Sequence, residues 1–143
     1  MEPIRFKFIQ KNFSDRIDDE KAILFGLPAS PERTILLAAP FYTSHFELIE
    51  SIVKSLPIGY TLYVKEHPAM IGACDGRRLI EMSQRYPQLK ILPPTTNNYE
   101  IIKSSRLVVS INSKSGMEAL LLGKPIIVLG DAFYTSCRLV RRA

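Results

Sequence analysis

The strongest constraint on the fold is a regular alternation of strand-like and helix-like segments from about residue 34 onward. Short apolar runs predict strands, and segments with apolar residues three or four positions apart predict amphipathic helices. Because strands separated by helices pair in parallel, the pattern predicts an α/β fold: a Rossmann-like, three-layer parallel sheet with helices on both faces. The predicted strands are 34–40, 59–67, 88–94, 106–112 and 125–130, and the predicted helices are 45–56, 75–86, 98–105 and 115–124.

The chain length of 143 residues suits one domain. Residues 1–33 include the charged stretch "DRIDDEK" and the turn-like "LPASPE", which predict a linker or the edge of something larger, so the domain is expected over residues 34–143. No apolar run approaches the roughly 20 residues that span a bilayer, and the start lacks the features of a secretory signal. We therefore expect a cytoplasmic location, with Cys74 and Cys137 as reduced thiols.

The net charge of +5 favours acidic partners, but the basic residues are scattered and form no stripe interleaved with aromatic residues, so nucleic acid is not an expected partner. The glycine-rich dinucleotide turn is missing between Ala38 and Phe46, and neither a P-loop nor a G-x-S-x-G elbow occurs. His45 and His67 lie without a carboxylate cluster, so no metal site and no cofactor are predicted.

A first polar cluster stands in "YVKEHPAMIG", at the end of the strand predicted at 59–67. Pro68 lacks an N–H and biases His67 toward an extended conformation, so the strand must end near this point. Side chains alternate along a strand, which places Lys65 and His67 on the same face. Ligands of α/β proteins bind at the carboxyl ends of the strands, so these residues are candidates for an anion site.

A second polar cluster stands in "INSKSGMEALLLGKP", where an apolar strand gives way to a helix. The free N–H groups and the dipole of a helix start favour an anion, and serine hydroxyls add donors. Gly116 would let a ligand approach the backbone closely, and Glu118 can accept hydrogen bonds from sugar hydroxyls. The candidate binding residues are Asn112, Ser113, Ser115, Gly116 and Glu118.

A purely structural interpretation of this cluster is also open. Ser115-x-x-Glu118 fits a capping box, and Gly123 with Pro125 is an ordinary helix stop. The ligand interpretation gains from position, because both clusters fall at the carboxyl ends of strands of one parallel sheet.

The segments "LYVKEHPAM" and "NNYEIIKSSRLVVSINSKSGMEALLLGKPIIVLGDAFY" resemble the capsule polysaccharide biosynthesis proteins, a group that includes bacterial Kdo transferases. The resemblance runs from about Thr34 to Tyr134. His67-Pro68 is similar to the family's HP motif, and "NSKSGMEAL" is similar to its serine-rich helix opening, in the same order. Bacterial sialyltransferases carry a similar pair of motifs. The resemblance implies one half of a GT-B glycosyltransferase fold and a sugar donor activated by CMP, above all CMP-Kdo.

The resemblance also implies roles for single residues. His67, as the catalytic residue, and the turn at Pro68 would meet the CMP phosphate, with Lys65 adding positive charge. Ser113 and Ser115, beside Asn112 and the N–H groups near Gly116, would hold that phosphate as a leaving group, and Glu118 would bind the ribose. Preorganised donors of this kind stabilise the charge that builds on a departing phosphate. Many family members have a glycine-threonine-glycine turn where this chain has "NSKSG".

Partners follow from the same resemblance. The acceptor site of GT-B enzymes belongs mainly to an N-terminal domain, so we expect that domain to be missing here, and we expect the chain to stop before the family's final helix. Peripheral association with inner-membrane polysaccharide assembly machinery would fit such a protein. Two other interpretations stay open, namely a UDP-sugar-binding domain similar to UDP-GlcNAc 2-epimerases and a non-catalytic interaction domain of polysaccharide assembly.

Overall fold

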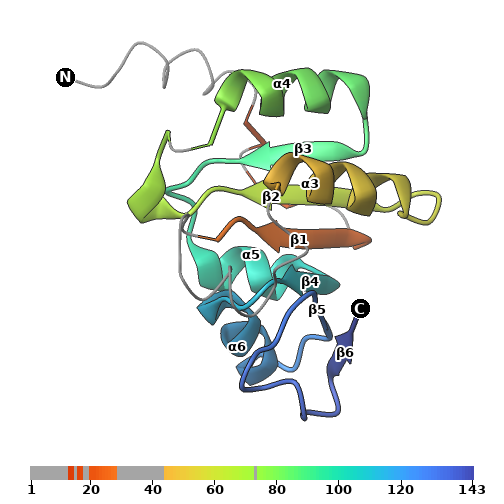
Figure 1. The fold of residues 1–143 in the computed structure, drawn as a ribbon, viewed down its shortest axis with the longest axis vertical. Helices are drawn as coiled ribbons and strands as arrows, with labels where there is room; N and C mark the ends of the chain where they lie inside the picture. The colour runs from red at the N-terminus through yellow and green to blue at the C-terminus, as the bar shows by residue number, and fades with distance from the viewer. Residues whose placement is uncertain (1–12, 15, 18–19, 29–43, 73) are drawn as a thin grey trace.

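Six parallel strands form one sheet in the order β3-β2-β1-β4-β5-β6 (Figure 1). This computed structural model describes residues 13–14, 16–17, 20–28, 44–72 and 74–143. The strands are β1 (Ala22–Gly26), β2 (Thr61–Lys65), β3 (Leu89–Leu92), β4 (Leu107–Ser110), β5 (Ile126–Val128) and β6 (Val140–Arg142).

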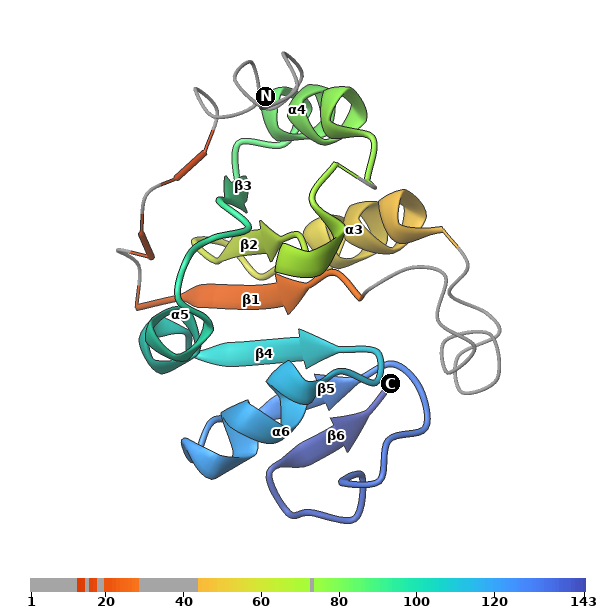
Figure 2. The ribbon, with the colours of Figure 1, turned by 90° about the vertical axis from the view of Figure 1, so that its left-hand side faces the viewer.

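Helices cover both faces of the sheet (Figures 1 and 2). One face packs against α3 (His45–Lys54) and α4 (Gly76–Arg85), and the other packs against α5 (Asn98–Ser104) and α6 (Lys114–Leu121). A short 3-10 helix, η1 (Pro68–Met70), follows β2. The Rossmann-like, three-layer α/β fold predicted from the sequence is therefore confirmed.

Side chains next to the helix starts explain where three of these helices begin. Ser44, Asp75 and Asn97 directly precede α3, α4 and α5, and the side-chain oxygen of each accepts a backbone N–H from the first turn. Such caps satisfy donors that have no partner inside the helix. Helix α6 differs, because its N-cap residue Ser113 makes no side-chain cap hydrogen bond.

Alternation along the strands divides the core in two. Phe25 and Val64 point to the α3 and α4 side, whereas Leu24 and Tyr63 point to the α5 and α6 side, and all four are almost fully buried. A sheet buried on both faces is typical of parallel strands flanked by crossover helices. Each core holds one pair of helices in place, and the strand ends between them are therefore rigidly positioned.

Two strands were not predicted from the sequence. β1 lies inside residues 1–33, so the interpretation of that segment as a linker or edge is wrong for Ala22–Gly26, which form a central strand. This apolar run has only five residues and follows a charged stretch, so it was not recognised as a strand. β6 was missed because two of its three residues are exposed arginines on an edge strand. The strand predicted at 34–40 lies outside the described residues.

The strand order fixes where a ligand can bind. From β1 the chain proceeds outward to β2 and β3, then returns through α5 to β4 on the other side of β1. Helix α3, which follows β1, and helix α6, which follows β4, therefore lie on opposite faces of the sheet, and a crevice forms between the ends of these two strands at this topological switch point. Among the described residues, no helix is long and apolar enough to cross a membrane.

Candidate functional site

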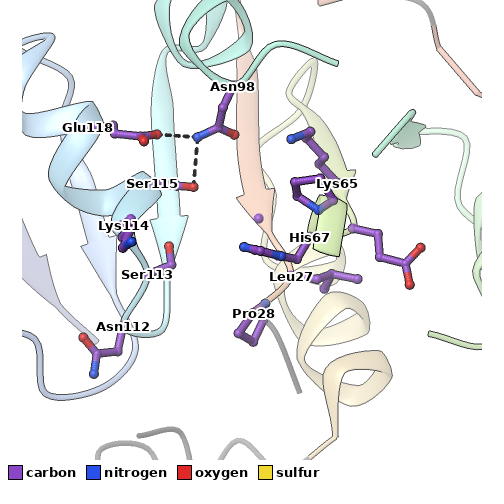
Figure 3. Close-up of a pocket in the computed structure, with 13 residues that line it drawn as sticks. Leu27, Pro28, Lys65, His67, Asn98, Asn112, Ser113, Lys114, Ser115 and Glu118 are labelled. Carbon is purple, nitrogen blue, oxygen red and sulfur yellow. Dashed lines mark hydrogen bonds between the residues drawn. The ribbon is translucent and has the colours of Figure 1, made fainter. Parts of the chain in front are cut away.

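A cavity of 610 Å³ lies at the switch point, where β1, β2 and β4 end (Figure 3). We call it the switch-point cavity. One side of the cavity is formed by residues 65–68, which we call the β2 rim. The opposite side is formed by residues 112–115 and 118, and we call the segment 112–118 the α6 rim. Its lining residues are Gly26, Leu27, Pro28, Lys65, Glu66, His67, Pro68, Asn98, Asn112, Ser113, Lys114, Ser115 and Glu118.

Lys65 supplies a buried positive charge to the cavity. The last residue of β2 is only 6% exposed, and Figure 3 shows its side chain extending toward the part of the cavity that holds Asn98. Within the described part of the chain, no hydrogen bond or ion pair joins its ammonium to another residue. Burial lowers the pKa of Lys65, and the nearby Glu118 charge opposes that shift. A buried, unpaired ammonium is costly, and an anionic ligand would offset that cost.

His67 faces the cavity with a defined tautomer. Its Nδ1 accepts the backbone N–H of Ala69 at 3.2 Å, as the N-cap of η1. In a neutral ring the proton must then sit on Nε2, which can donate a hydrogen bond. Pro68 stands at the first position of η1, where it needs no N–H. The local sequence alone therefore aims an imidazole donor at the cavity.

Glu66, between Lys65 and His67, forms no ion pair with any residue that the structure describes. Its carboxylate accepts the backbone N–H groups of Gly72 at 3.2 Å and Cys74 at 2.9 Å. These two bonds close the loop that carries η1. Glu66 therefore holds the β2 rim in shape.

The α6 rim has an open helix start. Instead of capping α6, the Ser113 hydroxyl lies 3.0 Å from the hydroxyl of Ser110, and the Ser113 N–H donates to Ser110 Oγ at 3.1 Å. The Ser113 carbonyl also accepts from Tyr134 Oη at 3.0 Å. With no side-chain cap, the N–H groups of Lys114 and Ser115 have no acceptor among the described residues and stay available to a bound anion.

Ser115 and Glu118 are joined by a residue that was not predicted. The Asn98 side-chain amide donates to Ser115 Oγ at 3.1 Å and also to Glu118 Oε2, as the dashed lines in Figure 3 show. Ser115 is inside α6, and the N-cap is Ser113. The capping box considered from the sequence is therefore wrong, because Ser115 does not occupy the cap position that it requires.

A second expectation, that Gly116 lets a ligand approach the backbone closely, is also wrong. It does not line the cavity, and its N–H bonds to the Ser113 carbonyl at 3.1 Å. A Cβ at this position would lie 2.2 Å from Tyr134 Oη. Glycine is therefore required for close packing against buried Tyr134, and the expected approach of a ligand to this backbone is not what the structure provides.

The other predicted binding residues all reach the cavity. The structure brings together Lys65, His67, Pro68, Asn112, Ser113, Ser115 and Glu118. Sequence reasoning missed Gly26, Leu27, Pro28, Glu66, Asn98 and Lys114 as lining residues. Lys114 was within the quoted serine-rich motif, whereas Asn98 gave no signal of its own. The described residues contain no group of three His, Cys, Asp or Glu side chains that could hold a metal ion.

Solved structures support the fold. Over 99% of its length this chain matches the β-Kdo 2,7-transferase of Thermosulfurimonas dismutans KpsC, with a TM-score of 0.70 and 21% identity, and it covers 47% of that chain. Over 86% of its length it matches the KpsC β-Kdo 2,4-transferase, with a TM-score of 0.63 and 21% identity, covering 38% of that chain. At this identity the likeness shows a shared fold.

Sequence comparison identifies the family. The chain is 40% identical to Protein FixF of Sinorhizobium fredii over 79 residues, which are 55% of this chain and 18% of FixF. It thus spans less than half the length of each of these relatives. The family model "Capsule polysaccharide biosynthesis protein" matches residues 23–140, and the chain therefore belongs to the capsule polysaccharide biosynthesis protein family.

Proposed function

We propose that this chain is the donor-binding domain of a glycosyltransferase in capsule polysaccharide biosynthesis, and that its donor is a CMP-activated sugar of the CMP-Kdo type. The observation that carries the proposal is buried Lys65, whose ammonium has no hydrogen-bond or ion-pair partner among the described residues and faces an uncapped helix start across the switch-point cavity. A cation and free N–H groups aimed at one space suit a phosphate. Family membership and the fold shared with KpsC transferases support the same function.

The phosphate is assigned to the space between the two rims. One side of it is formed by the N–H groups of Lys114 and Ser115 with the hydroxyls of Ser113 and Ser115. The other side is formed by the Nε2–H of His67 and the Lys65 ammonium. In sugar transfer an acceptor hydroxyl oxygen bonds to the anomeric carbon while the bond between that carbon and the phosphate oxygen breaks. The electron pair of the broken bond stays on the CMP phosphate, and the hydroxyl proton passes to a base outside this donor domain. Donors already aimed at that phosphate stabilise the developing charge. His67 is the catalytic residue in this scheme.

The ribose is assigned to Glu118. A carboxylate near a phosphate is unfavourable for the anion itself, but it is a strong acceptor for the two hydroxyls of a ribose. Glu118 sits one turn into α6, beyond the open N–H groups, so phosphate and ribose can occupy successive parts of the cavity. We assign only binding of the sugar donor to this domain, and not binding of the acceptor.

Nucleotide titration followed by NMR tests this proposal. We expect CMP to bind more tightly than UMP or AMP, with a dissociation constant on the order of 0.1 to 1 mM for the isolated domain. The shifted backbone signals should be those of residues 65–68 and 112–118. Inorganic phosphate alone should shift the signals of both rims, because groups on both rims are assigned to the phosphate.

Two results would count against the proposal. Equal affinities for the three nucleotides would remove the assignment of CMP. Shifts confined to surfaces outside the cavity would remove the site. Lys65→Met, which removes the cavity charge, should weaken CMP binding. Lys103→Met removes an exposed charge on α5 outside the cavity, and as the charge-matched control it should leave CMP affinity unchanged.

A further inference from the structure

One side-chain amide connects the phosphate and ribose parts of the switch-point cavity. Asn98 is the first residue of α5, yet its side chain reaches two residues of α6, Ser115 and Glu118. We infer that Asn98 is a positioning residue, which sets Ser115 as a hydrogen-bond donor and Glu118 as an acceptor for the nucleotide. This inference rests on the proposed function, because it concerns the same site.

The direction of the two hydrogen bonds follows from chemistry. An ionised carboxylate can only accept, so the group that faces Glu118 must be the NH₂ of Asn98. The same nitrogen lies 3.1 Å from Ser115 Oγ, and an amide NH₂ has one hydrogen for each partner. Figure 3 shows the nitrogen of Asn98 directed at these two residues. The NH₂ group of Asn98 therefore donates to both Ser115 and Glu118, which both act as acceptors.

This arrangement leaves Ser115 able to donate. A hydroxyl that already accepts one hydrogen bond keeps its own hydrogen for another partner. Because Ser115 lines the cavity, that hydrogen is available to a phosphate oxygen. Without Asn98, the hydroxyl loses the donor that fixes its orientation, so its hydrogen need no longer point into the cavity.

Glu118 is restrained in the complementary sense. One carboxylate oxygen accepts from Asn98, and the carboxylate keeps further acceptor sites for ribose hydroxyls. Within the described residues Glu118 forms no ion pair with Lys65, although its charge acts on that ammonium. By holding the carboxylate on the α6 side, Asn98 leaves Lys65 to the ligand.

The positioning role is separable from helix stability. The N-cap of α5 is Asn97, whose Oδ1 accepts the N–H groups of Tyr99 at 2.9 Å and Glu100 at 3.4 Å. The side chain of Asn98 takes no part in that cap. An aspartate at position 98 would also suit the helix, because an acidic residue in the first turn is favourable. Asn97→Ala is therefore a matched control, which weakens the same helix and spares the bridge.

The test compares CMP with 2′-deoxy-CMP in four proteins: the unchanged chain, Asn98→Ala, Asn98→Asp and Asn97→Ala. We expect Asn98→Ala to weaken CMP about tenfold and to reduce the preference for CMP over 2′-deoxy-CMP to near one. Asn98→Asp should weaken CMP further, because its carboxylate cannot donate and repels Glu118. Asn97→Ala should lower the unfolding midpoint while keeping the preference for CMP over 2′-deoxy-CMP.

Several outcomes would overturn the inference. If the unchanged chain binds CMP and Asn98→Ala keeps both the affinity and the ribose preference, Asn98 does not position the site, and the proposed function stands. If the unchanged chain binds no CMP, both fail. An independent readout is the side-chain amide signal of Asn98 in the free protein: its two protons should respond separately to Ser115→Ala and Glu118→Gln, and a single averaged signal that ignores both changes would contradict the bridge.

Discussion

The two rims of the switch-point cavity are held in place in different ways. On the β2 rim, His67 bonds to an N–H two residues away, and Glu66 bonds to N–H groups six and eight residues away. On the α6 rim, Ser115 depends on Asn98, which is 17 residues distant, and Ser113 depends on Tyr134, which is 21 residues distant. The loop of the β2 rim is held by local bonds, whereas the α6 rim adds tertiary contacts from Asn98 and Tyr134 to the local bonds between Ser110 and Ser113.

This difference predicts how each rim responds to mutation. A local loop that loses a hydrogen bond can rearrange without disturbing the core. A helix start that is packed against a buried ring cannot, because the surrounding side chains are close-packed. Packing changes at the α6 rim should therefore have the largest effect on global stability, whereas the structural rearrangement after a change in the β2-rim loop should stay within a few residues.

The largest effect is expected for Gly116→Ala. The new Cβ would lie 2.2 Å from Tyr134 Oη and 2.7 Å from Tyr134 Cζ, and Tyr134 is only 5% exposed, so the ring cannot move into solvent. Overpacking of this kind should lower the free energy of unfolding by about 3 kcal/mol. Urea unfolding monitored by circular dichroism measures it.

Gly123→Ala is the control at the other end of α6. Gly123 has φ +68°, and nothing lies within 4 Å of the position that a Cβ would take. Its cost should be only the left-handed backbone, about 1 kcal/mol. If the two alanine variants lose the same stability, contact with Tyr134 is not what demands glycine at position 116, and the contrast between the rims weakens.

An intermediate effect is expected for Glu66→Ala on the β2 rim. The change removes the acceptor for Gly72 N–H and Cys74 N–H and should cost about 1.5 kcal/mol. Amide chemical-shift changes should remain within residues 64–75, as the local origin of this rim requires. Glu81→Ala, an exposed acidic position on α4, should change neither stability nor shifts measurably. Shift changes that extend to α6 would contradict the local description.

The same contrast explains how much the sequence could predict. Lys65, His67 and Pro68 were predicted because strand alternation and proline chemistry act within a few residues. Asn112, Ser113, Ser115 and Glu118 were predicted because a strand followed by a helix places that turn at the sheet edge. The partners that orient them, Asn98 and Tyr134, could not be found, since nothing in the local sequence shows which distant side chain will reach a given helix.

The role predicted for Gly116, close approach of a ligand to the backbone, was wrong because it too depends on a residue that is distant in sequence. A glycine at a helix start is compatible with a ligand, a turn or a close-packed ring, and only the position of Tyr134 distinguishes them. The strands that were missed also lack a local signal. β1 is short and follows charged residues, and β6 is an edge strand with exposed arginines, so hydrophobic alternation identifies neither.

The smallest stability effect, opposite in sign, is expected for Lys65→Met, which keeps the buried aliphatic stem and removes the charge. Because burial lowers the pKa of Lys65 in the folded protein, the folded state releases its proton before the unfolded state does as pH rises. Between that lowered pKa and the unfolded value of about 10.4, the unfolded state binds more protons, so the stability of the unchanged chain increases with pH. Below this window the cost of the buried charge is fully present.

Lys65→Met should therefore be more stable than the unchanged chain at pH 7, with an advantage that shrinks toward pH 10, and it should bind CMP several-fold more weakly. Urea unfolding at the two pH values and CMP titration at pH 7 measure both parts. A variant that is less stable at pH 7 and binds CMP as before would show that the ammonium serves the fold, and it would leave the α6 rim and His67 as the phosphate-binding groups of the cavity.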